Sequence, residues 1–218
     1  MRMRIALAGT VIGTATGIGL SRVARWRRTW GMDPSEAAKP LPGDDLVPVT
    51  TAIETRGITI DAPPDAVWPW LVQLGQDRGG FYSYDWLDRL FGYLDAPSAE
   101  EILPEYGSIR VGDTIPLGRG PDWPVVEVVP ERTLVVEPLE AAVTWAFVLV
   151  PIDERSTRLV TRVRYRSEPT LTGRLVTAAM GPAAFVMTRK MLLGIKRRAE
   201  ALARRRRLDV EVRWSAPA

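Results

Sequence analysis

The chain has 218 residues, of which 46% are hydrophobic and 25% are charged, the composition of one globular domain with a sizeable core and a tail at each end. It contains no cysteine and no histidine, which excludes disulfides, thiol nucleophiles, zinc sites of the Cys/His type and His-based triads. Any catalysis therefore has to use Asp, Glu, Tyr, Lys, Arg or Ser.

Positive charge is concentrated at the two ends of the chain. Residues 1–30 carry six arginines and no acidic residue, and residues 189–207 carry nine Lys or Arg against one Glu. Because the net charge of the whole chain is only +3, the body between these ends is strongly acidic. This pattern argues against nucleic-acid binding and favours ends that contact an anionic membrane surface, although solvated helix faces and export-type flanks explain it equally well.

The segment from Ile5 to Leu20 has sixteen uncharged residues between two groups of arginines. As a helix it would be about 24 Å long, shorter than the ~30 Å hydrocarbon core of a bilayer, so its insertion is marginal. Gly9, Gly13 and Gly17 follow at intervals of four, a spacing on which membrane helices pack closely and which hints at a homodimer through this helix. An uncleaved anchor, a cleaved signal peptide and a surface-lying or disordered tail all remain open.

The composition divides the chain into four parts. Residues 1–30 form a basic, weakly hydrophobic segment, and residues 31–50 read as a linker because they are rich in Pro, Asp and Gly. Residues 51–207 form the globular domain, and residues 208–218 form a tail. More arginines follow the apolar N-terminal segment than precede it, which favours a membrane-associated protein with a cytoplasmic body; export is the alternative.

The globular pattern begins with a strand and a helix. Apolar and polar residues alternate from Ala52 to Ile60, as in a strand with one buried face. Asp61, followed closely by two prolines, is typical of a capped helix start. The helix runs to Leu74 and ends at Gly75, which tolerates the backbone angles of a helix end.

Two shorter helical segments are predicted next. Ser83 is placed to cap a helix from Tyr84 to Phe91, in which Trp86 is one of the core-facing residues. Ser98 opens a capping-box pattern for one further turn.

Beyond Val111 the hydrophobic period changes to two. Five successive strands are predicted: Thr114–Leu117, Trp123–Val129, Thr133–Pro138, Val143–Ile152 and Arg158–Ser167. In the last strand the arginines share one face, which predicts a solvent-exposed side and a covered side of the sheet.

A helix from Leu171 to Arg206 follows the strands, and it is long enough to cover the sheet. Gly181-Pro182 is expected to kink or hinge this helix, because proline lacks the amide hydrogen and clashes with the preceding turn. Antiparallel strands followed by one long helix define an α+β order.

Two stretches of this order are typical of one superfamily. The first runs from Ile58 to Leu71 and contains a strand and an Ala-Pro-x-x-x-Val-Trp helix opening; the second is the strand pair Trp145–Leu149 and Thr157–Arg162. Over about residues 51 to 205 the chain resembles the START-like (SRPBCC) helix-grip superfamily of birch-pollen-type allergens, polyketide cyclases and lipid-transfer domains, and an actinobacterial-type subgroup within it. The resemblance implies a curved antiparallel sheet of about six or seven strands wrapped around the C-terminal helix, with a cavity for an apolar ligand.

The stretch from Gly75 to Trp86 is the candidate ligand site. It places four aromatic and three charged residues between two apolar helical patterns, and its three glycines allow a sharp turn that points aromatic side chains inward. The predicted ligand-binding residues are Asp77, Arg78, Phe81, Tyr82, Tyr84, Asp85, Trp86 and Trp145. Core packing is the alternative role for the aromatic members.

The charged residues of this stretch, Asp77, Arg78 and Asp85, lie in an aromatic cluster and need partners there. A structural ion pair between an aspartate and Arg78 is one interpretation. The alternatives are that Arg78 binds a carboxylate or phosphate of the ligand, or that Asp77 or Asp85 performs acid–base chemistry with a pKa raised by burial.

Two functions follow. The first is a non-catalytic carrier or sensor of a lipid or polyketide-like molecule at a membrane surface, and the second is a polyketide cyclase or aromatase that uses Asp or Tyr for proton transfer. Without histidine a carboxylate base would need a large upward pKa shift, so we favour the carrier and assign no catalytic residue, metal or cofactor. An interaction domain with a filled core is a third possibility.

Overall fold

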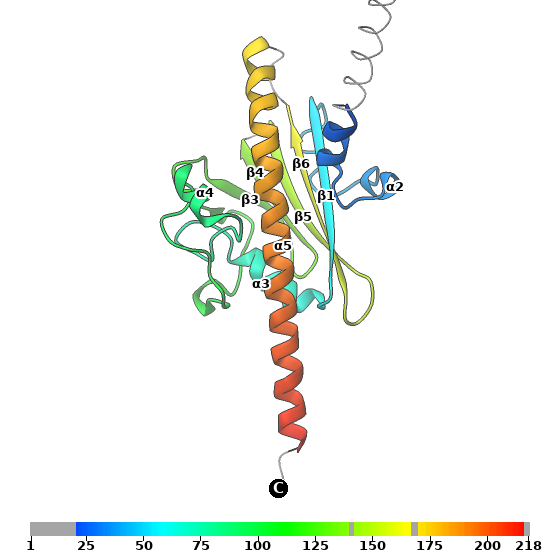
Figure 1. Cartoon of the computed structure of the whole chain (residues 1–218), viewed down its shortest axis with the longest axis vertical. Helices are drawn as coiled ribbons and strands as arrows, with labels where there is room; N and C mark the ends of the chain where they lie inside the picture. The colour runs from blue at the N-terminus through cyan, green and yellow to red at the C-terminus, as the bar shows by residue number, and fades with distance from the viewer. Residues whose placement is uncertain (1–20, 140–141, 167–169, 216–218) are drawn as a thin grey trace, which may run out of the picture.

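One antiparallel sheet wraps around a single long helix in the computed structural model (Figure 1), which describes residues 21–139, 142–166 and 170–215. The candidate membrane segment Ile5–Leu20 and its glycine face lie outside these residues. Among the residues described, no helix combines the length and the apolar character that a membrane crossing requires.

The sheet has six strands in the described part of the chain, in the order β1-β6-β5-β4-β3-β2, with every neighbouring pair antiparallel. Their bounds are β1 Ala52–Ile60, β2 Thr114–Ile115, β3 Trp123–Val129, β4 Thr133–Leu139, β5 Val143–Pro151 and β6 Thr157–Tyr165. Irregular register between Val125 and Glu127 and between Val136 and Leu139 interrupts β3 and β4. Such irregularities bend strands locally, which suits a sheet that curves around a helix.

The helices differ in length, and the last is much longer than the others. Their bounds are α2 Pro34–Ala37, α3 Pro64–Val72, α4 Asp85–Leu90, the 3₁₀ helix Pro104–Tyr106 and α5 Leu171–Ser215, and residues 21–28 are also helical. In Figure 1, α5 crosses the face of the sheet and extends beyond it at both ends. This is the helix-grip arrangement, so the predicted α+β fold is confirmed.

The core lies between the inner face of the sheet and the middle of α5. Phe147 and Leu159 point inward from β5 and β6 and belong to the same buried cluster as Leu192 and Ile195 of α5. Burying such side chains contributes about 1.5–3 kcal/mol each, which fixes α5 against the sheet. α3 packs on the same helix and closes this end of the core.

The outer face of β6 was predicted to be exposed, and that prediction is wrong. Residues 29–48 lie across it, where Arg158 donates to the Glu36 carboxylate at 2.8 Å and Arg162 donates to Asp44 at 2.6 Å. Arg162 is only 4% exposed. The arginine pattern is typical of a solvent-exposed strand face, but acidic side chains and carbonyl groups of residues 29–48 bind these arginines instead. The segment predicted as a linker is thus in contact with the sheet.

Local start and stop signals were less accurate than the element order. α3 has Pro63 at its N-cap with no side-chain cap, so Asp61 does not play the predicted role. Tyr84, not Ser83, is the N-cap of α4. No helical turn follows Ser98, because its hydroxyl is engaged by α4 and donates to Asp85 at 2.8 Å.

α5 is longer than predicted. It runs as one helix through Gly181 and Pro182 and ends at Ser215 instead of Arg206. The kink expected at Gly181-Pro182 stays a prediction. Gly194 lies where α5 passes closest to the backbone of Tyr82, and a Cβ atom there would collide with it.

Candidate ligand cavity

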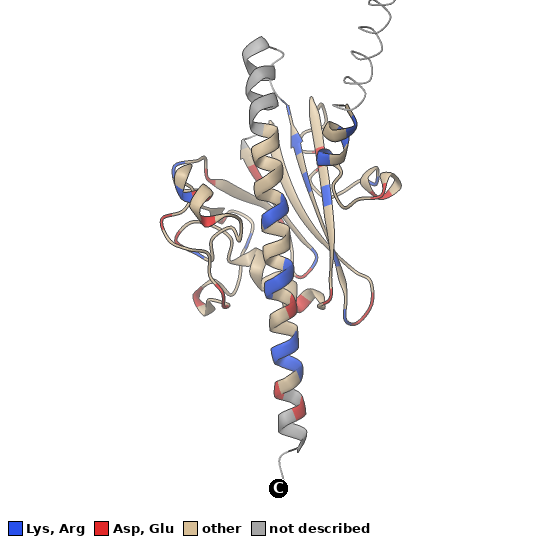
Figure 2. Cartoon of the chain, in the orientation of Figure 1, with Lys and Arg blue, Asp and Glu red and all other residues tan. Residues whose placement is uncertain are grey.

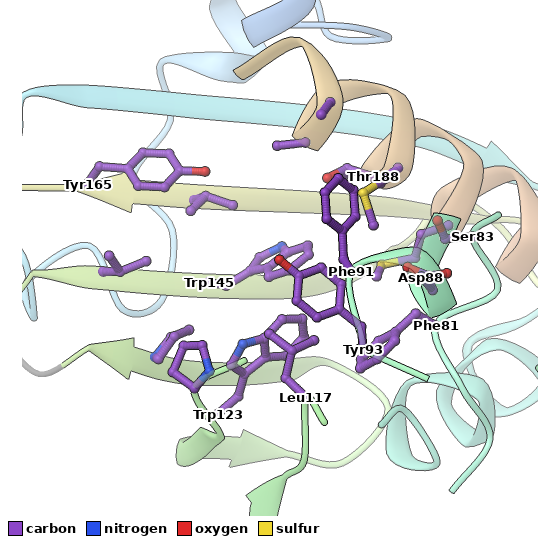
Figure 3. Close-up of a pocket in the computed structure, with 18 residues that line it drawn as sticks. Phe81, Ser83, Asp88, Phe91, Tyr93, Leu117, Trp123, Trp145, Tyr165 and Thr188 are labelled. Atoms are coloured by element: carbon purple, nitrogen blue, oxygen red, sulfur yellow. The ribbon is translucent and has the colours of Figure 1, made fainter. Parts of the chain in front are cut away.

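A cavity of about 340 Å³ lies between the sheet and α5, on the side of α4 (Figure 3). Strands β3 to β6, α4, α5 and the loops beside α4 contribute its walls. The lining residues are Phe81, Ser83, Asp88, Phe91, Tyr93, Leu117, Pro121, Trp123, Pro138, Val143, Trp145, Val163, Tyr165, Ala183, Ala184, Met187, Thr188 and Met191. Its size and its mostly apolar lining are those of a small-molecule site.

One wall is a row of aromatic rings. The ring centroids of Phe81 and Trp123 are 5.5 Å apart, and those of Trp123 and Trp145 are 4.8 Å apart. The row continues from Trp145 to Phe147 at 5.1 Å. The Trp145 indole N–H donates to Thr161 Oγ1 at 2.5 Å, so its polar atom is satisfied within the sheet. The ring faces therefore offer an apolar, electron-rich surface to a ligand.

The turn before Phe81 brings the first ring into this row. Gly75 and Gly80 bond each other through both backbone groups, and both have positive φ, at 125° and 76°. Side chains disfavour these angles, so the glycines permit the reversal. The predicted sharp turn is therefore present, and Phe81 points into the cavity.

The opposite wall comes from α5 and is adaptable. Met187 and Met191 project from this helix, and Ala183 and Ala184 leave room between it and the sheet. Unbranched methionine side chains fit irregular ligand surfaces better than branched ones. At the rim, Phe91 is 38% exposed, so the cavity reaches the surface beside α4.

Polar groups occur at both ends of the cavity and between them. In Figure 3, Ser83 and Asp88 lie together at one end, near Thr188 and Phe81, and Tyr165 lies at the other. Burial raises the pKa of Tyr165, and the nearby Glu54 raises it further, so its hydroxyl stays protonated. The Tyr93 hydroxyl lies between these ends in Figure 3.

Asp88 is the carboxyl group of the cavity and is 1% exposed. Burial, together with repulsion from Asp85, raises its pKa to about 6. The Ser83 hydroxyl lies near enough to lower this pKa in part, but it does not reach hydrogen-bonding geometry. A carboxyl group poised near neutral pH can hold a cation or exchange a proton.

Two of the eight predicted ligand residues, Phe81 and Trp145, line this cavity. The other six are not among its lining residues. Tyr82 is buried against Trp70, with ring centroids 5.7 Å apart, and Tyr84 is half-buried with Lys190 over its ring. Trp86 is 63% exposed.

The three charged candidates also lie outside the lining. Arg78 donates to the Val72 carbonyl at 2.8 Å and lies over the ring of Tyr106. Burial lowers its pKa. Asp77 is exposed, and Asp85 accepts from Ser98. The predicted ion pair between Arg78 and an aspartate does not form within the described residues, because Arg78 binds a backbone carbonyl instead.

Sequence reasoning missed Asp88 because it treated α4 as an amphipathic helix with an apolar inner face. In the structure Trp86 and Leu90 point outward, and Asp88 points inward. The signal was weak, since a single aspartate between Leu87 and Arg89 fits a solvated face. Trp123 lay in a predicted strand, but nothing in its pattern linked it to Trp145.

Comparison with known proteins finds matches among solved structures. The chain matches no protein-family model and no curated protein. Similar solved structures include a protein of Thermobifida fusca (18% identity, 70% of this chain and 95% of that chain, TM-score 0.45). They also include a polyketide cyclase-like protein of Corynebacterium glutamicum (16% identity, 76% and 97%, TM-score 0.33) and a norcoclaurine synthase mutant of Thalictrum flavum (16%, 69% and 96%, TM-score 0.39). The helix-grip arrangement rests on the topology of the chain itself.

No group of acidic residues that could hold a metal ion occurs in the described ranges.

Proposed function

We propose that the protein binds a small hydrophobic ligand, lipid or polyketide-like, in the cavity between its sheet and α5. The observation that carries this proposal is the cavity itself: about 340 Å³, walled by Phe81, Trp123 and Trp145 and open at Phe91. A filled core would leave no such space. Burial of apolar ligand surface against these rings supplies the binding free energy.

A cavity-filling substitution tests this proposal. Ala184→Phe places a ring inside the cavity, so it should weaken binding of the neutral fluorophore N-phenyl-naphthylamine by about tenfold or more, the loss expected from excluding roughly one buried ring. Titration of full-length protein, followed by probe fluorescence, measures the affinity. Val186→Phe is the matched control, because Val186 lies on the same turn of α5 and is exposed. Saturable binding that is equal in both variants would place the probe elsewhere and contradict the proposal.

We further propose that binding takes place at a membrane surface. The C-terminal part of α5 extends beyond the sheet and carries several basic residues (Figure 2). Arg204 and Arg207 are exposed on this helix. Basic residues close to an anionic leaflet contribute about 1 kcal/mol each. The proposal predicts that full-length protein sediments with anionic vesicles and that replacing both arginines by Gln weakens this. Unchanged sedimentation of that variant at the same salt concentration counts against α5 as the contact.

A cyclase-type enzyme is the second candidate, and Asp88 is the observation that favours it. Its carboxyl is buried in the cavity and has a pKa of about 6, which suits proton transfer near neutral pH. This residue replaces Asp77 and Asp85 as the group to test for acid–base chemistry. An enzyme would lose turnover in Asp88→Asn while still binding a neutral substrate, whereas a carrier has no turnover to lose.

A further inference from the structure

The buried end of the cavity contains polar atoms that the protein leaves unsatisfied. Within the described residues, Asp88 Oδ2 and Ser83 Oγ are buried and have no hydrogen-bond partner. Both residues line the cavity, and Figure 3 shows them together. An unpaired buried carboxylate costs several kcal/mol, and folds tolerate it where a ligand or function needs the charge.

Cationic side chains near α4 are bound elsewhere. Arg89 donates to the Asp85 backbone at 3.2 Å, and Lys190 lies over the Tyr84 ring at 5.4 Å. Arg198 donates to Ala99 and Glu100. The charged group that acts on the Asp88 carboxylate is Asp85, which repels its negative charge. The part of the chain that the structure describes therefore supplies no counter-ion to this carboxylate.

The aromatic wall favours a cation as well. Faces of Phe, Tyr and Trp rings attract positive charge, and a carboxylate beside several such rings is a typical environment for an organic ammonium group. Asp88 shares the cavity with Trp123, Trp145 and Tyr93. An anionic ligand group would instead be repelled by Asp88, and a neutral one would leave the charge uncompensated.

We propose that the ligand of this cavity carries a protonated amine, which ion-pairs with Asp88 and hydrogen-bonds to Ser83 while its apolar part lies against Trp123 and Trp145. This inference rests on the proposed function and narrows its ligand class from any hydrophobic molecule to a cationic amphiphile or aromatic amine. With a pKa of about 6, Asp88 is mostly ionised at neutral pH even without the ligand.

Three probes of matched shape test the inference by calorimetric titration of the full-length protein at neutral pH. Naphthylethylamine is cationic, naphthylethanol is neutral and naphthylpropionate is anionic. A charge-assisted hydrogen bond to a buried carboxylate should make the amine bind about tenfold to a hundredfold more tightly than the alcohol. The acid should bind most weakly. Asp88→Asn should remove the preference for the amine while leaving the affinity for the alcohol within about twofold.

Asp122→Asn is the matched control, because it removes the same charge from an exposed site beside Trp123 and should preserve the order of affinities. If the alcohol binds as tightly as the amine, or if the amine preference survives in Asp88→Asn, the amine assignment is wrong although the cavity still binds ligands. If none of the three probes binds and N-phenyl-naphthylamine does not bind either, the proposed function fails together with this inference. A melting curve on each variant confirms that it is folded.

Discussion

At the scale of single residues, Asp88 distinguishes this cavity from a purely apolar one. Its carboxyl is buried, its Oδ2 has no hydrogen-bond partner within the described residues, and its pKa is about 6, above the usual 3.8. A raised folded-state pKa means that the native protein holds this proton more tightly than the unfolded chain does. The free energy of unfolding therefore decreases as the pH rises from about 4 to about 6, because the folded protein then has to ionise Asp88 in a buried site. Above that range this destabilisation is complete.

Asp88→Asn should therefore stabilise ligand-free protein at neutral pH. The shift corresponds to roughly 2–3 kcal/mol at most, and the amide has polar atoms of its own to satisfy, so we expect on the order of 1 kcal/mol. The advantage should shrink as the pH falls from about 6 to about 4, because wild-type Asp88 then becomes protonated in the folded state. Thermal melts of wild type and Asp88→Asn across this pH range measure the difference in stability. An advantage that is independent of pH, or a variant less stable than wild type at neutral pH, contradicts this account.

Residue-level prediction from the sequence succeeded for side chains whose position follows from a strand or turn. Trp145 alternates inward on a recognisable strand, and Phe81 follows two glycines that reverse the chain. It failed for Asp88, because the polarity of one residue on a six-residue helix does not say which face is buried. Whether any of the eight candidates contacts a ligand stays a prediction.

At the scale of elements, the N-terminal segment is the least expected part of the fold. The Arg162 guanidinium binds Asp44 and Thr55 and donates to the carbonyls of Ala37 and Lys39 at 2.7 and 2.9 Å. Glycine, proline and acidic residues in residues 31–50 look like a linker by composition alone. Their contacts depend on arginines more than a hundred residues later, which local patterns do not report.

Arg162→Met should destabilise the protein by about 1–3 kcal/mol, because it removes the hydrogen bonds to Thr55 and to two carbonyls and leaves the half-buried Asp44 paired with Arg164 alone. Chemical denaturation measures the loss, and residues 29–48 should become more accessible to proteases. Arg155→Met changes an exposed arginine in the turn before β6 and should stay within about 0.5 kcal/mol of wild type. Equal stability of the two variants would show that the segment is held by other contacts.

The contacts of the N-terminal segment determine which truncated variants can test membrane attachment without disturbing the fold. Trp26 packs on Phe185 of α5 with centroids 5.2 Å apart, and the Trp30 carbonyl accepts from Gly57. Deleting residues 1–30 would therefore remove contacts of the body along with any membrane segment. Deleting residues 1–20 alone separates membrane attachment from folding more cleanly.

At the scale of the whole molecule, the architecture could be predicted from hydrophobic periods and element order. Period-two strands followed by one long helix leave few arrangements that bury both, and the sheet around α5 is one of them. The cavity could not be predicted in the same way. It forms where side chains from four strands, two helices and the loops beside α4 leave a volume unfilled. Local sequence patterns do not show how completely side chains from distant elements fill the space between them.

The most direct test of the central claim is native mass spectrometry of the full-length protein purified gently from its own host. We predict a stoichiometric small-molecule adduct that is bound by wild type and Val186→Phe and lost in Ala184→Phe. Fragmentation of the adduct should reveal an apolar skeleton with an ionisable nitrogen. A clean apo mass that does not change when amine, alcohol or lipid probes are added would contradict the account, and would leave a cavity that binds nothing.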